Sequence, residues 1–347
     1  MKKAFKNILV VRTDRIGDVI LTTPALGALR QCFANARITL LVAASTKELV
    51  DRNAHVNEIL VDDRGGRHAG VRGFWQLVAE LKKKRFDLAV IYHTKRRTNL
   101  ACFLARIPHR IGYKNNKYGF LLTHPVKDKR HLGQKHESEY CLELLSPLGV
   151  TSADETPMIS IHLEAEQWAD ELFAGLKFDH DNPPFAIHMG ASDPSKCWPL
   201  DNFFHVMTHI MAGYNAPILL VGSQGLKPKA SVLAQRYEGH IFDLCGETNL
   251  SQLASVLKRC RMLISNDSGP VHIAAAVGTP VVSIFTRNQP GINPERWRPL
   301  EPRSRVIAVP ADTRPSFKKG GSVTAEYLAK IKPEAVLEAV DAIYKLC

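Results

Sequence analysis

The sequence predicts an α/β protein of two doubly wound domains, each built on its own parallel sheet. Its 347 residues are more than one ordinary domain of ~150 residues needs. Hydrophobic residues make up 45% of the chain and charged residues 23%, which is typical of a folded globular protein. Short apolar runs alternate with segments of helical periodicity along the whole length, and this alternation favours parallel strands joined by helices.

The first half of the chain contains short, mainly aliphatic runs, which are typical of strands buried on both faces. Segments with apolar residues at helical spacing separate these runs. The predicted strands are 8–12, 38–42, 59–61 and 87–92, and the predicted helices are 23–33, 45–52 and 74–84.

The second half repeats this rhythm and ends on a further helix. The predicted strands are 185–189, 217–222, 262–265 and 281–285, and the predicted helices are 201–212, 227–237, 251–258 and 269–277. The segment 311–332 is polar and rich in Gly and Lys, so we expect an exposed loop there. An apolar stripe after Pro333-Glu334 predicts a last helix at 335–346.

A polar segment with two consecutive prolines, Pro183-Pro184, precedes the first strand of the second half and is typical of a domain boundary. We therefore expect an N-terminal domain at 1–165 and a C-terminal domain at 180–332. Ligands of doubly wound sheets bind beyond the C-terminal ends of the strands, so two facing domains would enclose a cleft. The loops expected to carry function are those after Arg12, Met189, Gly222 and Ser265.

The net charge of +12 is unevenly distributed between the two halves. Residues 1–150 contain 27 Lys and Arg against 13 Asp and Glu, a net charge of +14, whereas the remainder has a net charge of −2. This asymmetry predicts an anionic partner for the first domain and a different partner for the second.

The lengths of the apolar runs and the spacing of the cysteines exclude several classes of protein. No apolar run approaches the ~18–20 residues that span a bilayer, and the apolar run 8–11 is too short for a secretory signal. We therefore expect a cytoplasmic protein. Its seven cysteines are scattered, without a CxxC pair, so neither a disulfide framework nor a zinc site is expected.

The first segment with residues suited to binding or catalysis is RTDRIGD, residues 12–18, directly after the first predicted strand. Gly17 in a strand-to-helix turn lets a ligand approach the backbone, and Asp18 falls at the start of the next helix. A carboxylate there is suited to act as a general base toward a hydroxyl. The alternative is that Asp18 only caps the helix. A GxGxxG dinucleotide fingerprint is absent.

The second segment is HMGASDPSKCWP, residues 188–199, between a predicted strand and a predicted helix. The small residues Gly190, Ala191 and Ser192 expose backbone N–H groups, and Lys196 adds a mobile positive charge. Both features suit a phosphate or diphosphate. The alternative is that Lys196 is an ordinary solvated lysine.

The third and most specific segment is SNDSGPVHIAAAVGTP, residues 265–280. A buried strand ends in a polar turn, and Pro270 favours the first turn of a helix of small residues. The N-terminus of this helix, at Ser268 and Gly269, is suited to bind a diphosphate. Asp267 is suited to bind sugar hydroxyls and His272 to reach a phosphate, unless Asp267 caps the helix and His272 packs in the core.

In this order and at this spacing, the three segments resemble glycosyltransferase family 9, best known for ADP-heptose:lipopolysaccharide heptosyltransferases. The matching stretches are RIGDVILTTPALGALR, HMGAS followed by KCWP, and NDSGPVHIAAAVGTPVVSIF, with LCGETNL upstream of the last. The resemblance covers about residues 7–286.

The resemblance implies a GT-B fold, with two Rossmann-like domains facing across a cleft. The nucleotide sugar would bind the C-terminal domain and the acceptor the N-terminal one, and the last segment, 333–347, would cross back to the N-terminal domain. The family inverts the anomeric centre without a bound metal, so the resemblance implies no cofactor, only a nucleotide-sugar donor, ADP-heptose.

The resemblance also assigns roles to individual residues. Asp18 would be the general base, Lys196 would bind the phosphates, and Asp267 and His272 would bind the donor. Adenine contacts are expected from Ser223 and Gln224. The remaining expected donor-binding residues are Gly190, Ala191, Ser192, Thr248, Ser268 and Gly269.

The basic first half fits the acceptor that the resemblance implies, the phosphorylated lipopolysaccharide inner core at the cytoplasmic face of the inner membrane. The enzyme would then be a peripheral membrane protein. The basic residues near predicted strand ends that we expect to contact this acceptor are Arg15, Arg64, Arg67, Lys95, Arg96 and Arg97.

Two stretches depart from the family pattern, and both bear on the identity of the sugar. One is TRNQPGI, residues 286–292, where the family often has a Gly-Pro-Thr turn. The other is Asp193-Pro194-Ser195, which lengthens the loop before Lys196.

Three alternatives remain open from the sequence. The chain is a family 9 enzyme with another nucleotide sugar or another acceptor, a nucleic-acid-binding protein, or a catalytically silent scaffold. Nucleic-acid binding is disfavoured because there is no helix-turn-helix, RNP-type or zinc signature and the basic residues are not interleaved with aromatic ones. Asp18 and Lys196 together argue against a silent scaffold.

Overall fold

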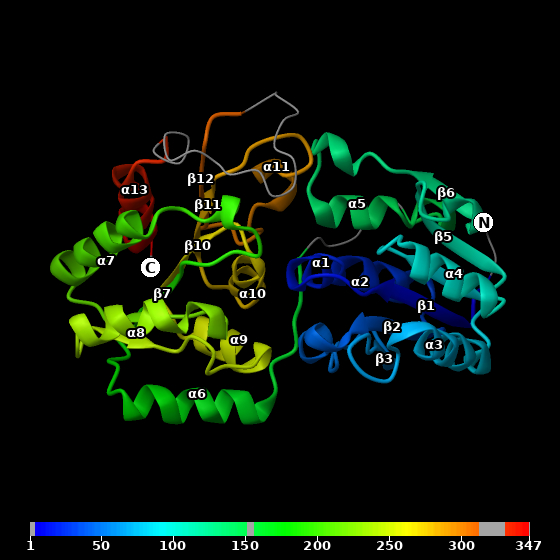
Figure 1. The fold of residues 1–347 in the computed structure, drawn as a ribbon, viewed down its shortest axis with the longest axis horizontal. Coiled ribbons are helices and arrows are strands. Elements are labelled where there is room, and N and C mark those ends of the chain that lie inside the picture. The colour runs from blue at the N-terminus through cyan, green and yellow to red at the C-terminus, as the bar shows by residue number, and fades with distance from the viewer. Residues whose placement is uncertain (1–3, 151–155, 312–329, 347) are drawn as a thin grey trace. The chain divides into compact units, whose positions relative to one another are not determined.

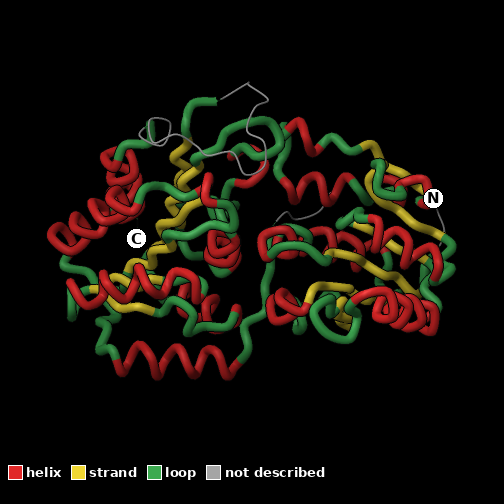
Figure 2. The backbone as a smooth tube through the Cα atoms, in the orientation of Figure 1, coloured by secondary structure: helices red, strands yellow, loops and turns green. Residues whose placement is uncertain are grey.

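A computed structural model of the protein describes residues 4–150, 156–311 and 330–346. The chain forms two compact units, Met1–Ser160 and Ile161–Cys347 (Figure 1). Within the described residues, each unit contains one six-stranded sheet in which all paired strands are parallel. Helices lie on both sides of each sheet (Figure 2). The expectation of two Rossmann-like domains is therefore confirmed.

The sheet of the first unit has the order β3-β2-β1-β4-β5-β6. Its strands are β1 (Asn7–Arg12), β2 (Arg37–Ala43), β3 (Glu58–Asp62), β4 (Leu88–Ile91), β5 (His109–Lys114) and β6 (His124–Lys127). Its helices are α1 (Ile16–Ile20), α2 (Thr23–Cys32), α3 (Gly70–Lys84), α4 (Arg96–Leu104) and α5 (Glu137–Glu143), with short 3₁₀ helices η1 (Ala44–Leu49), η2 (Gly119–Leu121), η3 (Arg130–Leu132) and η4 (Ser146–Leu148).

Aliphatic residues on both faces explain why β1 lies at the centre of this sheet. It pairs with β2 on one side and with β4 on the other. Leu9 and Val11 belong to the same buried cluster as Leu77 of α3 and Ala101 of α4. Helices α3 and α4 therefore pack together on one face, while α2 packs with α5.

The sheet of the second unit has the order β12-β11-β10-β7-β8-β9, which is the same connectivity. Its strands are β7 (Phe185–His188), β8 (Ile218–Leu220), β9 (Ile241–Asp243), β10 (Met262–Asn266), β11 (Val281–Phe285) and β12 (Arg305–Ala308). Its helices are α6 (Leu163–Gly175), α7 (Leu200–Tyr214), α8 (Lys227–Arg236), α9 (Leu250–Lys258), α10 (Gly269–Ala276), α11 (Pro294–Trp297) and α13 (Pro333–Tyr344), with η5 (Pro194–Lys196) and η6 (Gln224–Leu226).

The predicted strands and helices correspond to elements of the structure, but one helix is of another type, and several strands and helices were not predicted, among them α1, α4 and α5. The segment 45–52, expected to be an α-helix, forms the 3₁₀ helix η1 instead. Four strands, β5, β6, β9 and β12, were not predicted. They are short or carry polar residues, as in the sequences HRIGYK and HPVK, so none of them contains an apolar run long enough to be recognised.

The C-terminal helix α13 belongs to the second unit. Its apolar stripe packs on the core of this unit, and the expected crossing of 333–347 to the N-terminal domain stays a prediction. Val336, Val340 and Ile343 are fully buried in the core that also contains Phe185. Tyr344 stacks on Tyr214 of α7 with ring centroids 4.0 Å apart. Most of the expected loop at 311–332 lies outside the described residues.

None of the described helices is both long enough and apolar enough to cross a membrane. In each unit the strand order reverses beside the central strand, between β1 and β4 in one sheet and between β7 and β10 in the other. The loops at the C-terminal ends of these two strand pairs are where ligands bind in this type of sheet.

Candidate active site

The residues expected from the sequence to carry function lie at the C-terminal edges of the two sheets. In the first unit they follow β1, β3 and β4, and these are Arg15, Asp18, Arg64, Arg67, Lys95, Arg96 and Arg97. In the second unit they follow β7, β8, β9 and β10, and these are Gly190, Ala191, Ser192, Lys196, Ser223, Thr248, Asp267, Ser268, Gly269 and His272.

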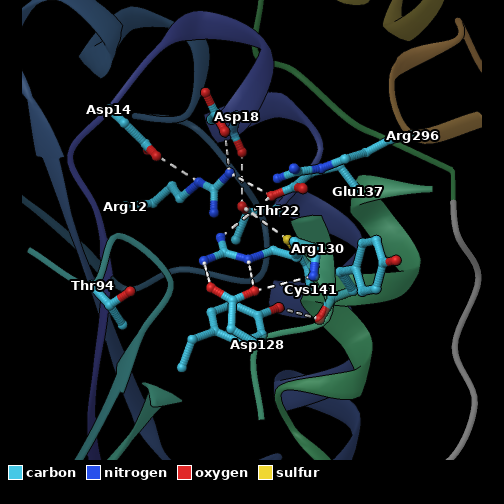
Figure 3. Close-up of polar contacts among 12 residues, drawn as sticks. Arg12, Asp14, Asp18, Thr22, Thr94, Asp128, Arg130, Glu137, Cys141 and Arg296 are labelled. Atoms are coloured by element: carbon cyan, nitrogen blue, oxygen red, sulfur yellow. Dashed lines mark hydrogen bonds and ion pairs between the residues drawn. The ribbon is translucent and has the colours of Figure 1, made fainter. Parts of the chain in front are cut away.

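A buried arginine organises the first of these edges. Arg12, the last residue of β1, has a side chain that is only 1% exposed and is surrounded by three carboxylates (Figure 3). Its Nε lies 3.1 Å from Asp14 Oδ1. Its Nη2 lies 2.5 Å from Asp18 Oδ1 and 3.0 Å from Glu137 Oε1. Arg12 therefore ties the loop after β1 to α5, which lies more than a hundred residues later in the sequence.

The three carboxylates differ in their access to solvent. Glu137 is fully buried, whereas Asp14 and Asp18 are 19% and 18% exposed. Only the two aspartates can therefore reach a ligand. Arg15 is the N-cap residue of α1, and Asp18 is the acidic residue of the first turn of this helix.

Arg12 and its three carboxylates form a cluster in which the pKa values of Arg12 and Asp14 are shifted. Burial alone would lower the pKa of Arg12, but the neighbouring carboxylates of Asp14 and Asp18 raise it well above its usual value. Burial raises the pKa of Asp14, although Arg12 acts in the opposite direction. A second arginine, Arg130, is held by Asp128 through two hydrogen bonds of 2.9 and 2.8 Å and lies 4.0 Å from Glu137 (Figure 3).

A chain of polar contacts crosses from β1 to β4, where the strand order reverses. Arg64 Nη2 donates to Thr13 Oγ1 at 3.0 Å, and Thr13 Oγ1 lies 2.9 Å from His93 Nδ1. Burial, together with the nearby cations Arg12 and Lys95, lowers the pKa of His93 to about 4. His93 is therefore neutral at pH 7, and its tautomer decides whether Nδ1 or the Thr13 hydroxyl donates in this hydrogen bond.

Three of the expected acceptor-binding arginines are paired with acids. Arg64 and Arg97 both bind the buried carboxylate of Asp62, at 2.7 and 2.9 Å. Burial alone would raise the pKa of Asp62, but the hydrogen bonds from these two arginines lower it below its usual value. Arg67 lies 3.1 Å from Glu80.

The remaining expected acceptor-binding residues, Arg15, Lys95 and Arg96, are exposed. Arg96 lies over the ring of Tyr118 at 5.8 Å from its centroid.

The second edge brings together Lys196 and Asp267, two residues that are 71 positions apart in the sequence. Lys196 Nζ forms an ion pair with Asp267 Oδ2, and their side chains are 18% and 10% exposed. Lys196 is therefore not an isolated solvated lysine, and Ser268, the N-cap residue of α10, makes no side-chain cap hydrogen bond. A cation and an acid thus share one site at the end of β10.

A fully buried asparagine, Asn266, fixes the loop that carries Lys196. Its Nδ2 donates to Met189 O at 2.9 Å, and its Oδ1 accepts from Trp198 N at 2.9 Å. Trp198 is itself 1% exposed. The loop between β7 and α7 is therefore bound at both ends to β10. Local sequence did not indicate this role, because Asn266 appeared only as part of a polar turn.

The N-terminus of α10 is adjacent to the same ion pair. Its N-cap residue, Ser268, directs its hydroxyl away from the helix, to 3.1 Å from His188 Nδ1 and 3.1 Å from Ser265 Oγ. A Cβ atom at Gly190 would lie 2.8 Å from Leu226 Cδ1, so a larger residue there would displace the end of that side chain.

The other expected donor-binding residues are spread along this edge. Ser223 is exposed and begins η6, and Thr248 is half-buried just before α9. His272 is only 4% exposed, and its ring centroid lies 6.4 Å from that of Trp297.

The two stretches that depart from the family pattern contact each other. Arg287 Nη2 lies 2.8 Å from Asp193 Oδ2, and Thr286 Oγ1 donates to Ser195 O at 2.9 Å. The longer loop before Lys196 is thus held by the unusual sequence after β11. The two departures form one structural unit, which could not be inferred from their separate positions in the chain.

His188 predicts a pH dependence of stability. Burial lowers the pKa of His188 to about 4, so its neutral form contributes stability above pH ~6.5 that is lost as the pH falls toward 4. We expect the contribution of His188 to the free energy of unfolding to be about 2 kcal/mol lower at pH 5 than at pH 7. Urea denaturation at both pH values measures it, and His188→Gln should remove that part of the difference. The same pH dependence in this variant and the wild type would contradict the assignment.

Three comparisons place the chain among known proteins. Residues 74–325 match the sequence family described as "Glycosyltransferase family 9 (heptosyltransferase)". Lipopolysaccharide heptosyltransferase 2 of Escherichia coli K12 is 25% identical over 347 residues, which cover 97% of this chain and 98% of that protein.

Solved structures show the same fold. A glycosyl transferase family 9 protein from Veillonella parvula has a TM-score of 0.88 at 23% identity, covering 100% of this chain and 99% of that one. The E. coli ADP-heptose lps heptosyltransferase II has a TM-score of 0.76 at 24% identity, covering 97% and 98% of the two chains.

Proposed function

Because the chain belongs to glycosyltransferase family 9, we propose that it transfers a heptose from ADP-heptose to a lipopolysaccharide core acceptor. The relatives support the donor and the acceptor class, since they include lipopolysaccharide heptosyltransferase 2 and an ADP-heptose heptosyltransferase. The observation that carries the chemistry is the pair of charged sites at the strand ends, the Asp18 carboxylate bound to Arg12 and the Lys196–Asp267 ion pair.

In the proposed reaction, Asp18 accepts the proton of the acceptor hydroxyl. The hydroxyl oxygen forms a bond to the anomeric carbon from the face opposite the nucleotide, and the bond from that carbon to the diphosphate breaks. The configuration at the anomeric centre is thereby inverted. Arg12 fixes the Asp18 carboxylate, and the partial exposure of this side chain leaves room for a substrate.

Lys196 and the N-terminus of α10 would stabilise the charge that develops on the departing ADP. Both lie at the end of β10, and Asp267 already holds the lysine at this position. Preorganised cations and backbone N–H groups lower the barrier for a leaving group that gains negative charge. Transfer without a bound metal is part of the proposal, because the lysine would supply the positive charge.

The acceptor would bind the basic first unit. Phosphorylated inner-core sugars carry negative charge, and the net charge of +14 on residues 1–150 attracts such a partner over a distance. Because Asp62 already pairs with Arg64 and Arg97, the exposed Lys95, Arg96 and Arg15 are the better candidates for direct contact. The lipid-linked acceptor would bring the enzyme to the cytoplasmic face of the inner membrane.

A second candidate function is transfer of a different sugar by the same chemistry. The contacts of Asp193 with Arg287 and of Ser195 with Thr286 favour it, because they shape the loop beside Lys196 through residues outside the family pattern.

A panel of nucleotide sugars distinguishes the two candidates. We expect ADP-heptose, and ADP alone, to raise the thermal unfolding temperature more than UDP or GDP sugars at equal concentration. A ligand at 100 times its Kd adds ~2.7 kcal/mol to the free energy of unfolding, which a thermal shift assay readily detects. Stabilisation by a UDP or GDP sugar, but not by ADP-heptose, would favour the second candidate.

A further inference from the structure

One margin of the first unit carries exposed aromatic, aliphatic and basic side chains, of which only Arg96 has a part in the proposed function. It consists of Val71, Arg72 and Trp75 of α3, Arg96 of α4, Lys117 and Tyr118 just before η2, and Phe120 in η2, and we call it the rim. We propose that the rim is a docking surface for an anionic lipid bilayer. Its role in catalysis rests on the proposed function, whereas its binding to lipid does not.

The three elements of the rim contact one another in turn, since α3 packs on α4 and α4 on η2. The ring centroids of Trp75 and Phe74 are 5.9 Å apart, and Arg97 lies 5.4 Å above the Phe74 ring. The neighbouring Arg96 lies 5.8 Å from the centroid of Tyr118. Tyr118 in turn contacts Phe120, with centroids 5.8 Å apart.

Two of the three elements begin at one edge of the sheet. Helices α3 and α4 start after β3 and β4, at the C-terminal edge where Asp18 lies, whereas η2 leads back toward the start of β5, where Arg110 Nε donates to Leu121 O at 2.8 Å. Helices α3 and α4 pack side by side (Figure 1).

The apolar side chains of the rim are unusually exposed. Val71 is 77% exposed, Trp75 54% and Phe120 79%. Single exposed apolar residues are common on protein surfaces, but a cluster of them marks a place where a protein or a membrane binds. Trp and Tyr prefer the headgroup level of a bilayer, where an apolar ring meets a polar boundary.

The charges of the rim favour a bilayer over another protein or a second copy of the chain. Arg72, Arg96 and Lys117 are exposed and form no ion pair with any described residue. Cations interspersed with Trp and Phe are typical of surfaces that bind anionic membranes, whereas the centres of protein interfaces are depleted of charge.

A second copy would bring these cations against one another. Acids near the rim do not reverse its charge, because Asp62 and Glu80 are paired with arginines of their own loop and helix. Each basic residue near an anionic bilayer adds to the attraction, which salt weakens.

Docking through the rim would have a direct consequence for a lipid-linked acceptor. Asp18 lies at the edge of the sheet where α3 and α4 begin, so docking through these two helices would bring the headgroup region of the bilayer toward the edge that holds the proposed base. The acceptor sugars would then reach Asp18 without leaving the membrane surface.

Vesicle co-sedimentation of the full-length protein tests the proposal without donor or acceptor. We expect binding to vesicles of phosphatidylethanolamine and phosphatidylglycerol, weaker binding at raised salt, and little binding to phosphatidylcholine alone. A triple variant, Val71→Ser/Trp75→Ser/Phe120→Ser, should bind the anionic vesicles ~10-fold more weakly or less, because three exposed apolar side chains are lost.

The matched control is Val232→Ser/Leu163→Ser, which removes exposed apolar side chains of the second unit that are 63% and 62% exposed. This control should bind the anionic vesicles like the wild type. Quenching of tryptophan fluorescence by brominated lipids should be present in the wild type and reduced in Trp75→Phe. Thermal unfolding of each variant shows that the fold is retained.

The proposal is overturned if the wild type does not bind anionic vesicles, or if the triple variant binds them as well as the wild type. It is also overturned if the triple variant changes only the oligomeric state, which would indicate a second copy on the rim. Turnover with a delipidated oligosaccharide acceptor separates the two proposals. Loss of vesicle binding with retained turnover supports the rim, whereas absent turnover with intact vesicle binding refutes only the proposed function.

Discussion

Asp18→Asn is expected to lower kcat for sugar transfer by about 10²–10⁴-fold, the usual contribution of a general base. Asparagine has nearly the shape of aspartate and keeps an oxygen for Arg12, which lies 2.5 Å from Asp18 Oδ1, but it cannot accept the acceptor proton. Binding of the nucleotide sugar should remain close to that of the wild type, because Asp18 belongs to the unit assigned to the acceptor. Steady-state kinetics and calorimetric titration with the donor measure the two effects.

Asp14→Asn is a closely matched control. Asp14 contacts the same guanidinium at 3.1 Å and is 19% exposed, against 18% for Asp18, so the two variants remove the same charge from the same partner. We expect Asp14→Asn to retain most of the turnover. Near-normal turnover in Asp18→Asn would refute the assignment of the base. An equal loss in both variants would show that the charge of the cluster matters and not a particular carboxylate.

Lys196→Met is expected to lower kcat by about 10²–10³-fold, the usual effect of removing one preorganised charge partner of a transition state. It should also weaken ADP binding, because the Asp267 carboxylate would then face the diphosphate without its cation. Methionine keeps the unbranched shape and most of the length of the side chain and removes its ammonium group. Single-turnover rates measure the first effect, and titration with ADP measures the second.

The control for this variant is Lys258→Met, which also breaks an ion pair of the second unit, 2.9 Å from Glu166. Lys258 lies in the last turn of α9, which leads into the N-terminal end of β10, whereas Lys196 and Asp267 meet at the C-terminal end of that strand. This control should leave both measurements near the wild-type values. If Lys196→Met lowers kcat no more than Lys258→Met does, stabilisation of the leaving group must come from other groups.

The fold was largely predictable because its signals are local. Each central strand is a short aliphatic run buried on both faces, such as Ile8–Val11 in β1, and it is followed by a segment of helical periodicity. The strands that were missed, β5 and β6, lie toward one side of the sheet and contain His, Arg, Lys or Pro. Their conformation depends on the neighbouring strand and not on their own composition.

The candidate site, too, was predictable from local sequence only in part. The sequence indicated Asp18, Lys196 and Asp267, because turn residues between a strand and a helix mark the ligand-binding ends of such sheets. It did not indicate the partners of these residues. Arg12 and Asp14 lie within the quoted RTDRIGD segment, but Glu137, Asn266 and the contact between Asp193 and Arg287 carry no local signal.

The sequence by itself determined the two parallel-sheet domains, the order of the three motifs and the concentration of positive charge in the first half. These properties depend on residue type and spacing within short segments. Only the tertiary structure decided that Arg12 binds three carboxylates, that Lys196 pairs with Asp267, and that α13 packs within the second unit. Such contacts join residues far apart in the chain, and the free energy of burying a charge or an apolar face depends on which groups the fold brings together.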